Sequence, residues 1–408
     1  MFLKKSLEKK LILKEQKVFK VLDTIHPSVY IHDTELDQFI KETTQLDYAV
    51  GVRRFFMNDF ENAKNKLKAI KKKSSMYVEA NYILGLISIR EKKIKRAKNH
   101  FKRCIMHTKY KKRSRLKPQS YIYSFRNRCV QQLGRLEYTE KDYKKALRVY
   151  NLVQKDDYLW PRFLMDKAWA YYMSGENERS LGSVISYKAP LLKRFMIPEA
   201  NYLRSLVYYD MCYFEKAENI YKEFNAVTWK FRNIAKTASR NKLLKLLISR
   251  KEPTTEKDKF LYFYLKGYKK DIRYLTFRES RRQIGMEIKK LSRIKSLKQA
   301  RVFLDTLYAY RKIIKEDFQD FLKNLSEDYY LQIKDMQSAF VKINLMISLK
   351  KRKKIEQENS DEFNDDFFEQ SLSNISDIDE KFIWDFRGGF WADELGDYAV
   401  ALRNRCVK

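Results

Sequence analysis

The side chains with the most reactive chemistry are four cysteines, and their spacing offers no reactive site. Cys104, Cys129, Cys212 and Cys406 form no CxxC pair and have no histidine pair nearby. Zinc sites and dithiol redox centres usually draw their ligands or sulfurs from such closely spaced residues. The sequence therefore predicts no metal site and no cofactor at the cysteines.

The cysteines can instead serve the fold. Cys104 falls at an inward-facing position of a predicted helix, so we expect it to act as a small buried apolar residue. A disulfide between Cys212 and Cys406 would tie the end of the chain to the last predicted repeat if the protein reaches an oxidising compartment. The sequence leaves open whether this pair forms.

One group near the N-terminus contains His26, His32, Asp33, Glu35 and Asp37. The two histidines are separated by five residues, which is not a ligand spacing on a helix. Asp33 and the following threonine are side chains that commonly begin helices. We therefore interpret this group as a helix start and not as a metal site.

The sequence motifs of the common enzyme classes are missing. There is no G-x-x-x-x-G-K-[ST], G-x-G-x-x-G, H-E-x-x-H or G-x-S-x-G pattern in the chain. With four scattered histidines and no glycine-rich loop, catalysis has little support. The sequence predicts a protein that is not an enzyme.

The elements that position the side chains are visible in a spacing that recurs five times: a small residue, a second small residue twelve positions later, and a bulky one four positions beyond. This spacing fits two helices folded into a hairpin, because small residues let the backbones approach and the bulky residue fills the space beside them. The small residues are thus the predicted repeat-packing positions. The five sets are Gly51/Ala63/Leu67, Gly85/Ala97/Phe101, Gly134/Ala146/Tyr150, Ala168/Ser180/Val184 and Ser205/Ala217/Tyr221.

The intervals between the first members of these sets are 34, 49, 34 and 37 residues. The shorter intervals match the tetratricopeptide repeat, and the long one indicates a basic insertion at 112–126 with Pro118 as a helix breaker. The chain has only ten glycines and six prolines in 408 residues, which favours an all-α fold. We predict a right-handed α-solenoid of the tetratricopeptide type with about five hairpins, then long paired, coiled-coil-like helices and a docked C-terminal tail.

The predicted organisation has five regions. Residues 226–354 are expected to hold a capping helix, read as one helix up to Pro253, and then long helices with an apolar stripe. These long helices pair within one chain or between two, so self-association through residues 284–350 is left open. The other regions are leading helices at 1–43, the solenoid at 44–225 with repeats near 44–77, 78–111, 127–160, 161–197 and 198–225, an acidic linker at 355–380 and an aromatic C-terminal motif at 381–408.

The acidic linker is expected to be disordered, because it contains ten acidic residues and no basic one. The rest of the chain is strongly basic, since the whole protein has 86 lysines and arginines against 52 acidic residues and a net charge of +34. The linker could therefore fold back and mask a basic surface. No run of eighteen apolar residues occurs, so no membrane span is expected.

The concave face of such a solenoid is lined by first-helix positions two, five, nine and twelve. These positions are mainly aromatic or apolar here, which predicts that the groove binds an apolar or amphipathic peptide of a protein partner. No lysine and asparagine pair suits a carboxylate clamp, and an alternative is that the rings pack on each other or on the C-terminal helices. The predicted groove residues are Tyr48, Phe55, Tyr82, Ile89, Arg135, Tyr138, Trp169, Tyr172, Tyr202 and Tyr209.

A second hypothesis is binding of RNA or another polyanion. It is based on the net charge, the run KYKKRSRLK at 109–117 and the run LKKRKK at 349–354. Tyr121, Tyr123 and Phe125 follow the first run and could stack on unpaired bases. Against it, basic and aromatic residues are spread along the whole chain.

Three segments together resemble a family of gliding-motility and cell-envelope tetratricopeptide proteins of gliding and predatory bacteria: 166–184, 189–217 and the tail WDFRGGFWADELGDY at 384–398. The resemblance implies a non-enzymatic scaffold in the periplasm or cell envelope. The family is usually exported behind a signal peptide, which is not apparent at the start of this sequence, so a cytoplasmic location is the alternative. A second departure from the family is Gly389, at a position where an acidic residue is expected. The family's tail pattern corresponds to Trp384, Phe386, Gly388, Trp391, Asp393, Glu394, Leu395, Gly396 and Tyr398.

Overall fold

A computed structural model describes most of the chain between residue 47 and residue 406. The predicted leading helices of 1–43 lie outside the described residues, as do most of the acidic linker and the first part of the basic insertion, 112–118. The described residues are 47–74, 76–108, 119–155, 157, 159–192, 197–294, 298–358, 389–391, 394–402 and 404–406.

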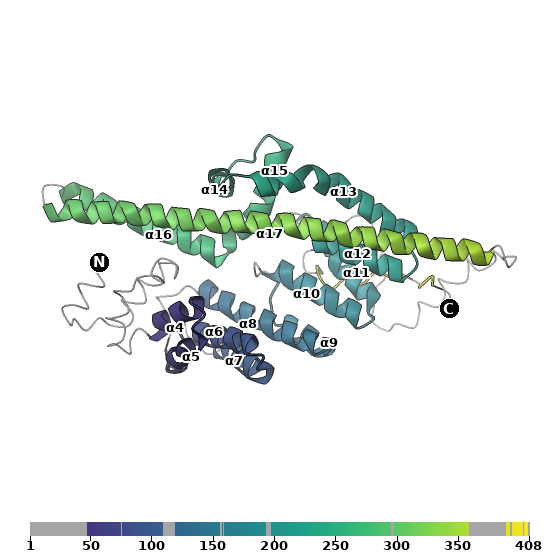
Figure 1. The fold of residues 1–408 in the computed structure, drawn as a ribbon, viewed down its shortest axis with the longest axis horizontal. Coiled ribbons are helices and arrows are strands. Elements are labelled where there is room, and N and C mark those ends of the chain that lie inside the picture. Colours follow the sequence, from purple (N-terminus) through teal and green to yellow (C-terminus); the bar gives the residue numbers. More distant parts are fainter. Residues whose placement is uncertain are drawn as a thin grey trace.

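The fold is all-α, as predicted, and its first half is a row of five helical hairpins in which each hairpin packs against the next (Figure 1). The described part of the chain contains no strand. The hairpins are α4 (Asp47–Phe56) with α5 (Phe60–Lys68), α6 (Tyr77–Arg90) with α7 (Ile94–Thr108), α8 (Gln119–Thr139) with α9 (Tyr143–Tyr150), α10 (Trp160–Met173) with α11 (Asn177–Ile185), and α12 (Pro198–Asp210) with α13 (Phe214–Thr237). The short 3₁₀ helix η3 (Ser186–Lys188) follows α11.

Every hairpin turns in the same way. The first helix ends in a Schellman motif: in the second hairpin the backbone N–H of Lys92 donates to Ile89 O at 2.9 Å and that of Lys93 donates to Ser88 O at 2.8 Å. The motif needs one residue with left-handed backbone, and that residue always lies seven positions after the small residue that marks the repeat. These residues are Asn58, Lys92, Lys141, Gly175 and Cys212, with φ between 58° and 83°.

The small residues that begin each set lie where the two helices of a hairpin touch. A Cβ atom on Gly85 would lie 2.3 Å from the Phe101 ring, so only glycine fits between α6 and α7. The same holds for the other two glycines: a Cβ atom on Gly51 would lie 2.6 Å from Leu67, and one on Gly134 would lie 2.2 Å from the Tyr150 ring. The recurrent spacing in the sequence therefore corresponds to one repeated contact between helices.

The second small residue of each set lies on the second helix of its hairpin and is completely buried. In four hairpins this residue is an alanine with 0% of its surface exposed, and these alanines are Ala63, Ala97, Ala146 and Ala217. Ala63 belongs to the hydrophobic core of the first two hairpins. Ala97 and Ala146 share the core that joins hairpins 2, 3 and 4. Ala217 packs with Ile343 and Ile347 of the long C-terminal helix. A methyl group at these positions fills the core without separating the helices.

In the last two hairpins a serine adds a hydrogen bond to the same contact. Ser180 Oγ donates to Ala168 O at 2.9 Å, so the alanine here lies on the first helix and the serine on the second. The order is reversed in hairpin 5, where Ser205 Oγ donates to Ala217 O at 3.1 Å. Both serines are fully buried, and these bonds satisfy their hydroxyls inside the core.

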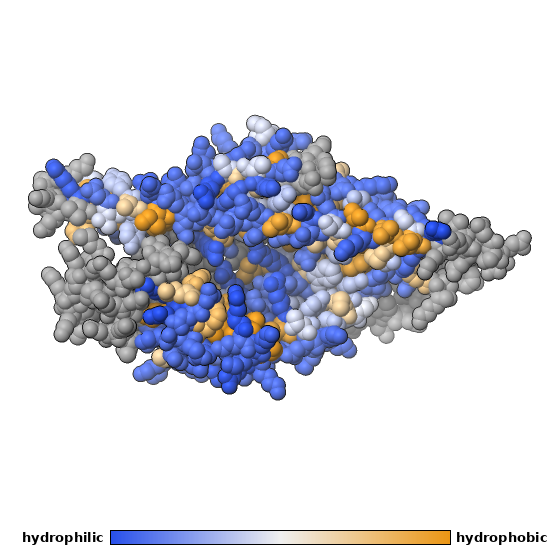
Figure 2. Space-filling view, in the orientation of Figure 1, coloured by the Kyte–Doolittle hydropathy of each residue, from blue (hydrophilic) through white to orange (hydrophobic). Residues whose placement is uncertain are grey.

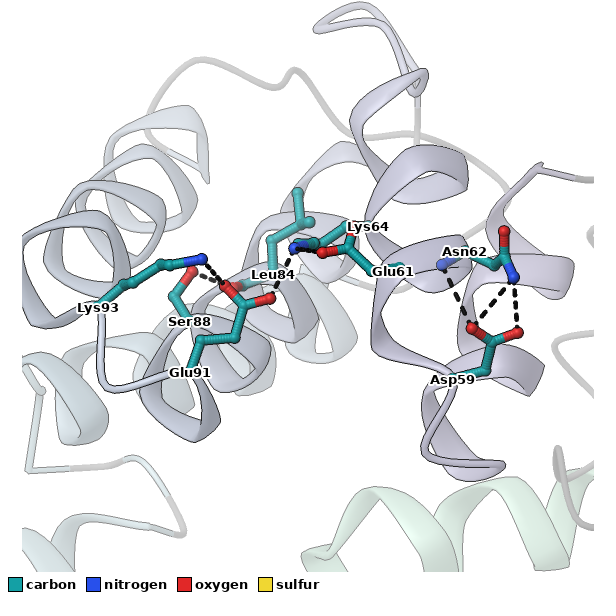
Figure 3. A network of polar contacts seen from close by, with 8 residues as sticks. All are labelled: Asp59, Glu61, Asn62, Lys64, Leu84, Ser88, Glu91 and Lys93. Carbon is teal, nitrogen blue, oxygen red and sulfur yellow. Dashed lines mark hydrogen bonds and ion pairs between the residues drawn. The ribbon is translucent and has the colours of Figure 1, made fainter.

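Polar contacts join one hairpin to the next, as Figure 3 shows for the first two. The Lys64 Nζ atom on α5 lies 2.7 Å from Glu61 and 2.6 Å from Glu91, which follows α6. Glu91 also pairs with Lys93 at 2.9 Å, and the two lysines lower the pKa of Glu91 to about 2. In the same view Asp59 caps α5 by accepting a hydrogen bond from the N–H of residue 62.

The third hairpin corrects two predictions. The second half of the predicted insertion, 119–126, is helical and lengthens α8 to 21 residues, because the helix can begin directly after Pro118. Cys104 is not a free buried thiol, since it forms a disulfide with Cys129 that joins α7 to α8. Both sulfurs belong to fully buried residues, so this bridge lies inside the core.

The helix predicted for 226–252 is two helices. α13 runs on to Thr237, the chain leaves helical geometry at Ala238 and Ser239, and α14 (Arg240–Ile248) begins there. The Ser239 side chain accepts a hydrogen bond from the N–H of residue 242 and so caps the new helix. The break allows α14 to bury its leucines in the core of the C-terminal half.

The C-terminal half is built around one helix of 61 residues, α17 (Lys298–Glu358). It is preceded by α15 (Glu256–Lys266), η4 (Gly267–Lys270), α16 (Ile272–Leu291) and η5 (Ser292–Ile294). α17 packs against α16 and then crosses α14, α13 and α12 (Figure 1). The predicted long helices thus pair within one chain, and α17 continues four residues into the stretch predicted to be a disordered linker.

α17 is apolar on two sides. Its inner stripe, including Phe340, Ile343 and Ile347, is completely buried. On the outer side Val341 and Leu345 are 57% and 62% exposed, and Figure 2 shows apolar residues along the right half of this helix on a mainly hydrophilic surface. Self-association through this region stays a prediction. No described helix is both long enough and apolar enough to span a membrane.

The C-terminal tail lies along hairpin 4 in the direction opposite to α11. The N–H of Gly396 donates to Ser186 Oγ at 3.0 Å, and the N–H of Val400 donates to Glu178 O at 3.0 Å. The fit is close, because a Cβ atom on Gly182 would lie 1.8 Å from the tail backbone. A disulfide between Cys212 and Cys406 then fixes the end of the tail to the turn of hairpin 5.

Candidate functional site

The predicted repeat-packing alanines belong to the core and contribute nothing to a binding surface. Their side chains have no exposed surface that a partner could contact, so the candidate site has to be built from other residues. These core residues are Ala63, Ala97, Ala146, Ala168 and Ala217.

The predicted groove residues of the first two hairpins have mainly packing roles. The Phe55 ring lies 6.0 Å from the Phe60 ring within hairpin 1. The Tyr82 ring lies 6.4 Å from Phe101 and 5.8 Å from Phe125, so it contributes to the junction of hairpins 2 and 3. The other two predicted residues here pack in the same way, Tyr48 against the hairpin 1 core and Ile89 against the next core.

The predicted groove residues of hairpin 5 are covered by the protein itself. The Tyr202 ring lies 5.8 Å from the Phe340 ring of α17, and the Lys350 Nζ atom of α17 lies 4.3 Å from the centre of the Tyr209 ring. Ile343 of α17 packs into the same cluster. For this hairpin the structure follows the alternative in which the rings pack on the C-terminal helices.

Between these two regions, hairpins 3 and 4 present a row of half-buried rings on their first helices. The Trp169 ring lies 5.8 Å from Tyr172 and 6.3 Å from Tyr202, so α10 and α12 are linked by aromatic contacts. Tyr138 on α8 lies 5.3 Å, centre to centre, from the Tyr143 ring. The row is continuous from α10 to Phe340 on α17.

Two carboxylates of α12 hold the polar ends of this row. Trp169 Nε1 donates a hydrogen bond to Glu199 Oε1 at 2.6 Å, and the Tyr172 hydroxyl donates to Asp210 Oδ2. Glu199 lies in the first turn of α12 and Asp210 is its last residue. We define the aromatic–acidic surface as Tyr138, Trp169, Tyr172, Tyr202, Glu199 and Asp210.

Among the described residues, these two carboxylates lack the ion pair that a neighbouring carboxylate has. Within the described part of the chain, neither Glu199 nor Asp210 forms an ion pair, whereas the neighbouring Asp166 pairs with Arg135 at 3.2 Å and accepts a hydrogen bond from Gln131 at 2.8 Å. Burial raises the pKa of Glu199 and the charge of Asp166 raises it further, while the hydrogen bond from Trp169 and the charge of Arg135 oppose the rise. This surface is therefore aromatic and acidic, whereas the sequence predicted an aromatic and apolar groove.

The tyrosines respond to the same charges. Burial raises the pKa of Tyr138, and the charges of Tyr143, Glu199 and Asp166 add to this. Burial also raises the pKa of Tyr202, with a contribution from Asp210. These effects place the tyrosine hydroxyls and the carboxylates in one electrostatic environment.

Glu199 and Asp210 were missed from the sequence, although one of them was recognisable. Glu199 occupies position two of its repeat, which faces the concave side by the same helical period as positions five, nine and twelve. Asp210 lies one residue beyond position twelve, at the helix end, where the period no longer predicts the direction of the side chain. The hydrogen bonds across the repeats identify both.

The predicted C-terminal motif divides into two parts. Trp384, Phe386, Gly388 and Asp393 lie outside the described residues. The remaining residues dock on hairpin 4 of the same chain. Trp391 is 57% exposed and Glu394 is also exposed, whereas Leu395 is buried. The Tyr398 hydroxyl accepts a hydrogen bond from the Trp391 N–H at 2.8 Å. Gly396 has a left-handed backbone with a φ of 87° and lies close to the Trp160 ring.

The basic segments of the second hypothesis are described only in part, and binding of a polyanion stays a prediction. The run at 109–117 lies outside them. Phe125, proposed to stack on bases, packs against Tyr82, and Arg128 lies over its ring at 5.7 Å. In the second run Lys351 pairs with Glu218 of α13 at 2.9 Å.

Comparisons with known proteins add little to this geometry. No protein-family model matches the chain, and no curated protein matches it significantly. Among solved structures the chain is similar to the crystal structure of the apo form of RapI, with a TM-score of 0.37, 11% identity, and coverage of 73% of this chain and 99% of that one. A likeness at this level carries no argument about function, and the resemblance to gliding-motility proteins stays a prediction.

Proposed function

We propose that this protein is a non-enzymatic scaffold of the tetratricopeptide type that binds a segment of a protein partner on its aromatic–acidic surface. The observation that carries this proposal is the row formed by Trp169, Tyr172 and Tyr202, whose polar ends are held across α10 and α12. Rigid aromatic side chains supply contact area at a low cost in conformational entropy, and they are enriched at binding hot spots.

The fold supports a preorganised surface. The five hairpins share one turn geometry and one helix contact, while α17 and the tail brace hairpins 4 and 5 from different sides. A surface that is already ordered loses little entropy when a partner binds. The hairpin pattern also accounts for the 34-residue period of the tetratricopeptide type.

We place this scaffold in the periplasm or at the cell envelope, within an assembly of the motility type that the sequence resemblance implies. The supporting observation is that all four cysteines are paired in two disulfides. Disulfides persist mainly in oxidising compartments. Alkylation of unreduced protein from its native cells tests this location, because a cytoplasmic protein would be labelled at its cysteines.

The binding proposal is tested by exchanging Trp169 for alanine in the full chain. We expect Trp169→Ala to reduce partner binding by about tenfold or more, the size typical of a hot-spot residue. The matched control is Trp391→Ala, which removes an exposed ring outside the surface. Binding would be measured against the partner purified after nuclease treatment at raised salt, and equal loss in both variants would contradict the proposal.

A further inference from the structure

We infer that the aromatic–acidic surface recognises a basic segment, with one lysine or arginine side chain held at Trp169 and Glu199 and another at Tyr172 and Asp210. This inference depends on the proposed function and specifies the chemistry of its partner. The chemical principle is that a cation is attracted both to the face of an aromatic ring and to a carboxylate.

The first argument is the unmatched charge. The chain has 86 lysines and arginines, yet within the described residues none of them forms an ion pair with Glu199 or Asp210. Keeping a carboxylate partly buried without a cation costs free energy, and the raised pKa of Glu199 is a sign of that cost. A cation from a partner would offset the cost, so binding and neutralisation favour each other.

The second argument is a basic segment that the protein already binds one hairpin further along. The Lys350 Nζ atom lies 4.3 Å from the centre of the Tyr209 ring and 5.9 Å from that of Phe214, and Lys351 pairs with Glu218 at 2.9 Å. Tyr209 is the twelfth position of hairpin 5, and Tyr172 is the twelfth position of hairpin 4. The same ring position therefore receives a lysine from α17 in one hairpin, and in the other it is half-buried with no cation over its ring among the described residues.

The third argument is that the surface has defined edges. On one side Phe340 of α17 closes the row at Tyr202. On the other side Asp166 is already satisfied by Arg135 and Gln131. Each of a partner's cations is left with one carboxylate of α12 as its acceptor, Glu199 at one end of the helix and Asp210 at the other.

The experiment measures binding of short synthetic peptides to the full, disulfide-bonded chain. The probe is a nine-residue peptide of alternating leucine and lysine, and the comparison peptide has glutamine in place of each lysine. We expect the lysine peptide to bind at least about tenfold more tightly, because each cation gains charge-assisted hydrogen bonds. Fluorescence anisotropy with a terminal label gives both affinities.

The variants remove charge and keep the hydrogen bonds. Glu199→Gln and Asp210→Asn retain an oxygen that can accept from Trp169 Nε1 and the Tyr172 hydroxyl, so the fold is preserved. We expect the double variant to weaken binding of the lysine peptide by about tenfold and to leave the glutamine peptide unchanged. The matched control Glu215→Gln neutralises an exposed glutamate at the start of α13 and should change neither.

The inference is overturned if the two peptides bind equally or if the double variant still binds the lysine peptide as tightly as the wild type. The proposed function would survive either result if Trp169→Ala still released the purified partner. If Trp169→Ala also binds the purified partner as tightly as the wild type does, the proposed function and this inference both fail.

Discussion

Hairpins 4 and 5 share one architecture and have different neighbours. Both contain a serine in the contact between their helices and a left-handed residue in their turn. The inner face of hairpin 5 is covered by α17, whereas that of hairpin 4 presents Trp169 and Tyr172 with carboxylates beside them. The comparison shows that the repeat sets the shape, while segments from elsewhere in the chain decide which faces remain available.

The side chains on the two faces explain the difference. Hairpin 5 offers Leu206 beside three tyrosines, and Ile343 and Ile347 of α17 are fully buried in that cluster. Burying each isoleucine contributes about 1.5–3 kcal/mol. Over hairpin 4 an apolar helix face would have to desolvate Glu199 and Asp210 without a cation, which is unfavourable.

The largest expected effect comes from separating α17 from hairpin 5. Replacing both Ile343 and Ile347 with alanine should destabilise this contact by about 4 kcal/mol or more, since each change removes buried methyl groups and leaves a cavity. Hydrogen exchange should accelerate in α12 and in the C-terminal half of α17, while the helices of hairpins 1 and 2 stay protected. Leu345→Ala is the matched control because this side chain is 62% exposed.

Unchanged exchange in α12 of the double variant would show that hairpin 5 does not need α17. That outcome would remove the contrast between the hairpins. Accelerated exchange throughout the solenoid would instead show that hairpins 4 and 5 unfold as one unit with the rest.

The next effect concerns the tail, which braces hairpin 4 and is attached to hairpin 5. Replacing Cys212 and Cys406 with serine opens a covalent loop with a sequence separation of 194 and should cost about 2–4 kcal/mol. The amide hydrogen of Val400, bonded to Glu178 O, should then exchange faster than in the wild type. If its protection persists, the packing of Leu395 alone holds the tail.

The sequence was sufficient for the hairpins and insufficient for what covers them. Small and bulky residues at fixed spacing are local signals, and they located contacts such as that of Gly85 with Phe101. Where α17 packs on hairpin 5, Phe340 contacts Tyr202. This contact depends on how a long helix crosses the solenoid, which is not a local signal. The bridge between Cys104 and Cys129 was missed, because nothing in the spacing of these two residues indicated it.

The candidate site was predictable only in part. The period of the first helices identified Trp169 and Tyr172, because both face the concave side. It did not show that α17 covers Tyr209 or that carboxylates hold the rings. The cover over Tyr209 depends on a distant helix, and the carboxylates that hold the rings come from the neighbouring repeat, so neither can be derived from the period of one helix.

A smaller effect is expected in the turn of hairpin 4. Gly175 has a φ of 83° and no neighbouring atom within 4 Å of a Cβ atom placed there, so Gly175→Ala should cost about 1 kcal/mol through backbone strain alone. The reverse change Lys141→Gly in hairpin 3, where φ is 64°, should stabilise by about 0.5–1 kcal/mol. Urea unfolding monitored by circular dichroism measures both, and equal signs would contradict the shared turn geometry.

The smallest effect compares two carboxylates of hairpin 5, one on each of its helices. Glu199 in the first turn of α12 forms no ion pair within the described residues, and burial raises its pKa although the charge of Arg135 opposes the rise, whereas Glu218 of α13 pairs with Lys351. A raised pKa in the folded state means that ionisation of Glu199 destabilises the fold. The wild type should therefore gain stability relative to the Glu199→Gln variant as the pH falls through the raised pKa to below 4.5. At pH 7 Glu199→Gln should stabilise by less than about 1 kcal/mol, because the glutamine keeps the hydrogen bond from Trp169 Nε1. Glu218→Gln should be neutral or destabilising at pH 7, since it removes an ion pair. Unfolding of both variants by urea at pH 7 and pH 4 separates the cases, and a destabilised Glu199→Gln at pH 7 would show that a cation already neutralises the surface.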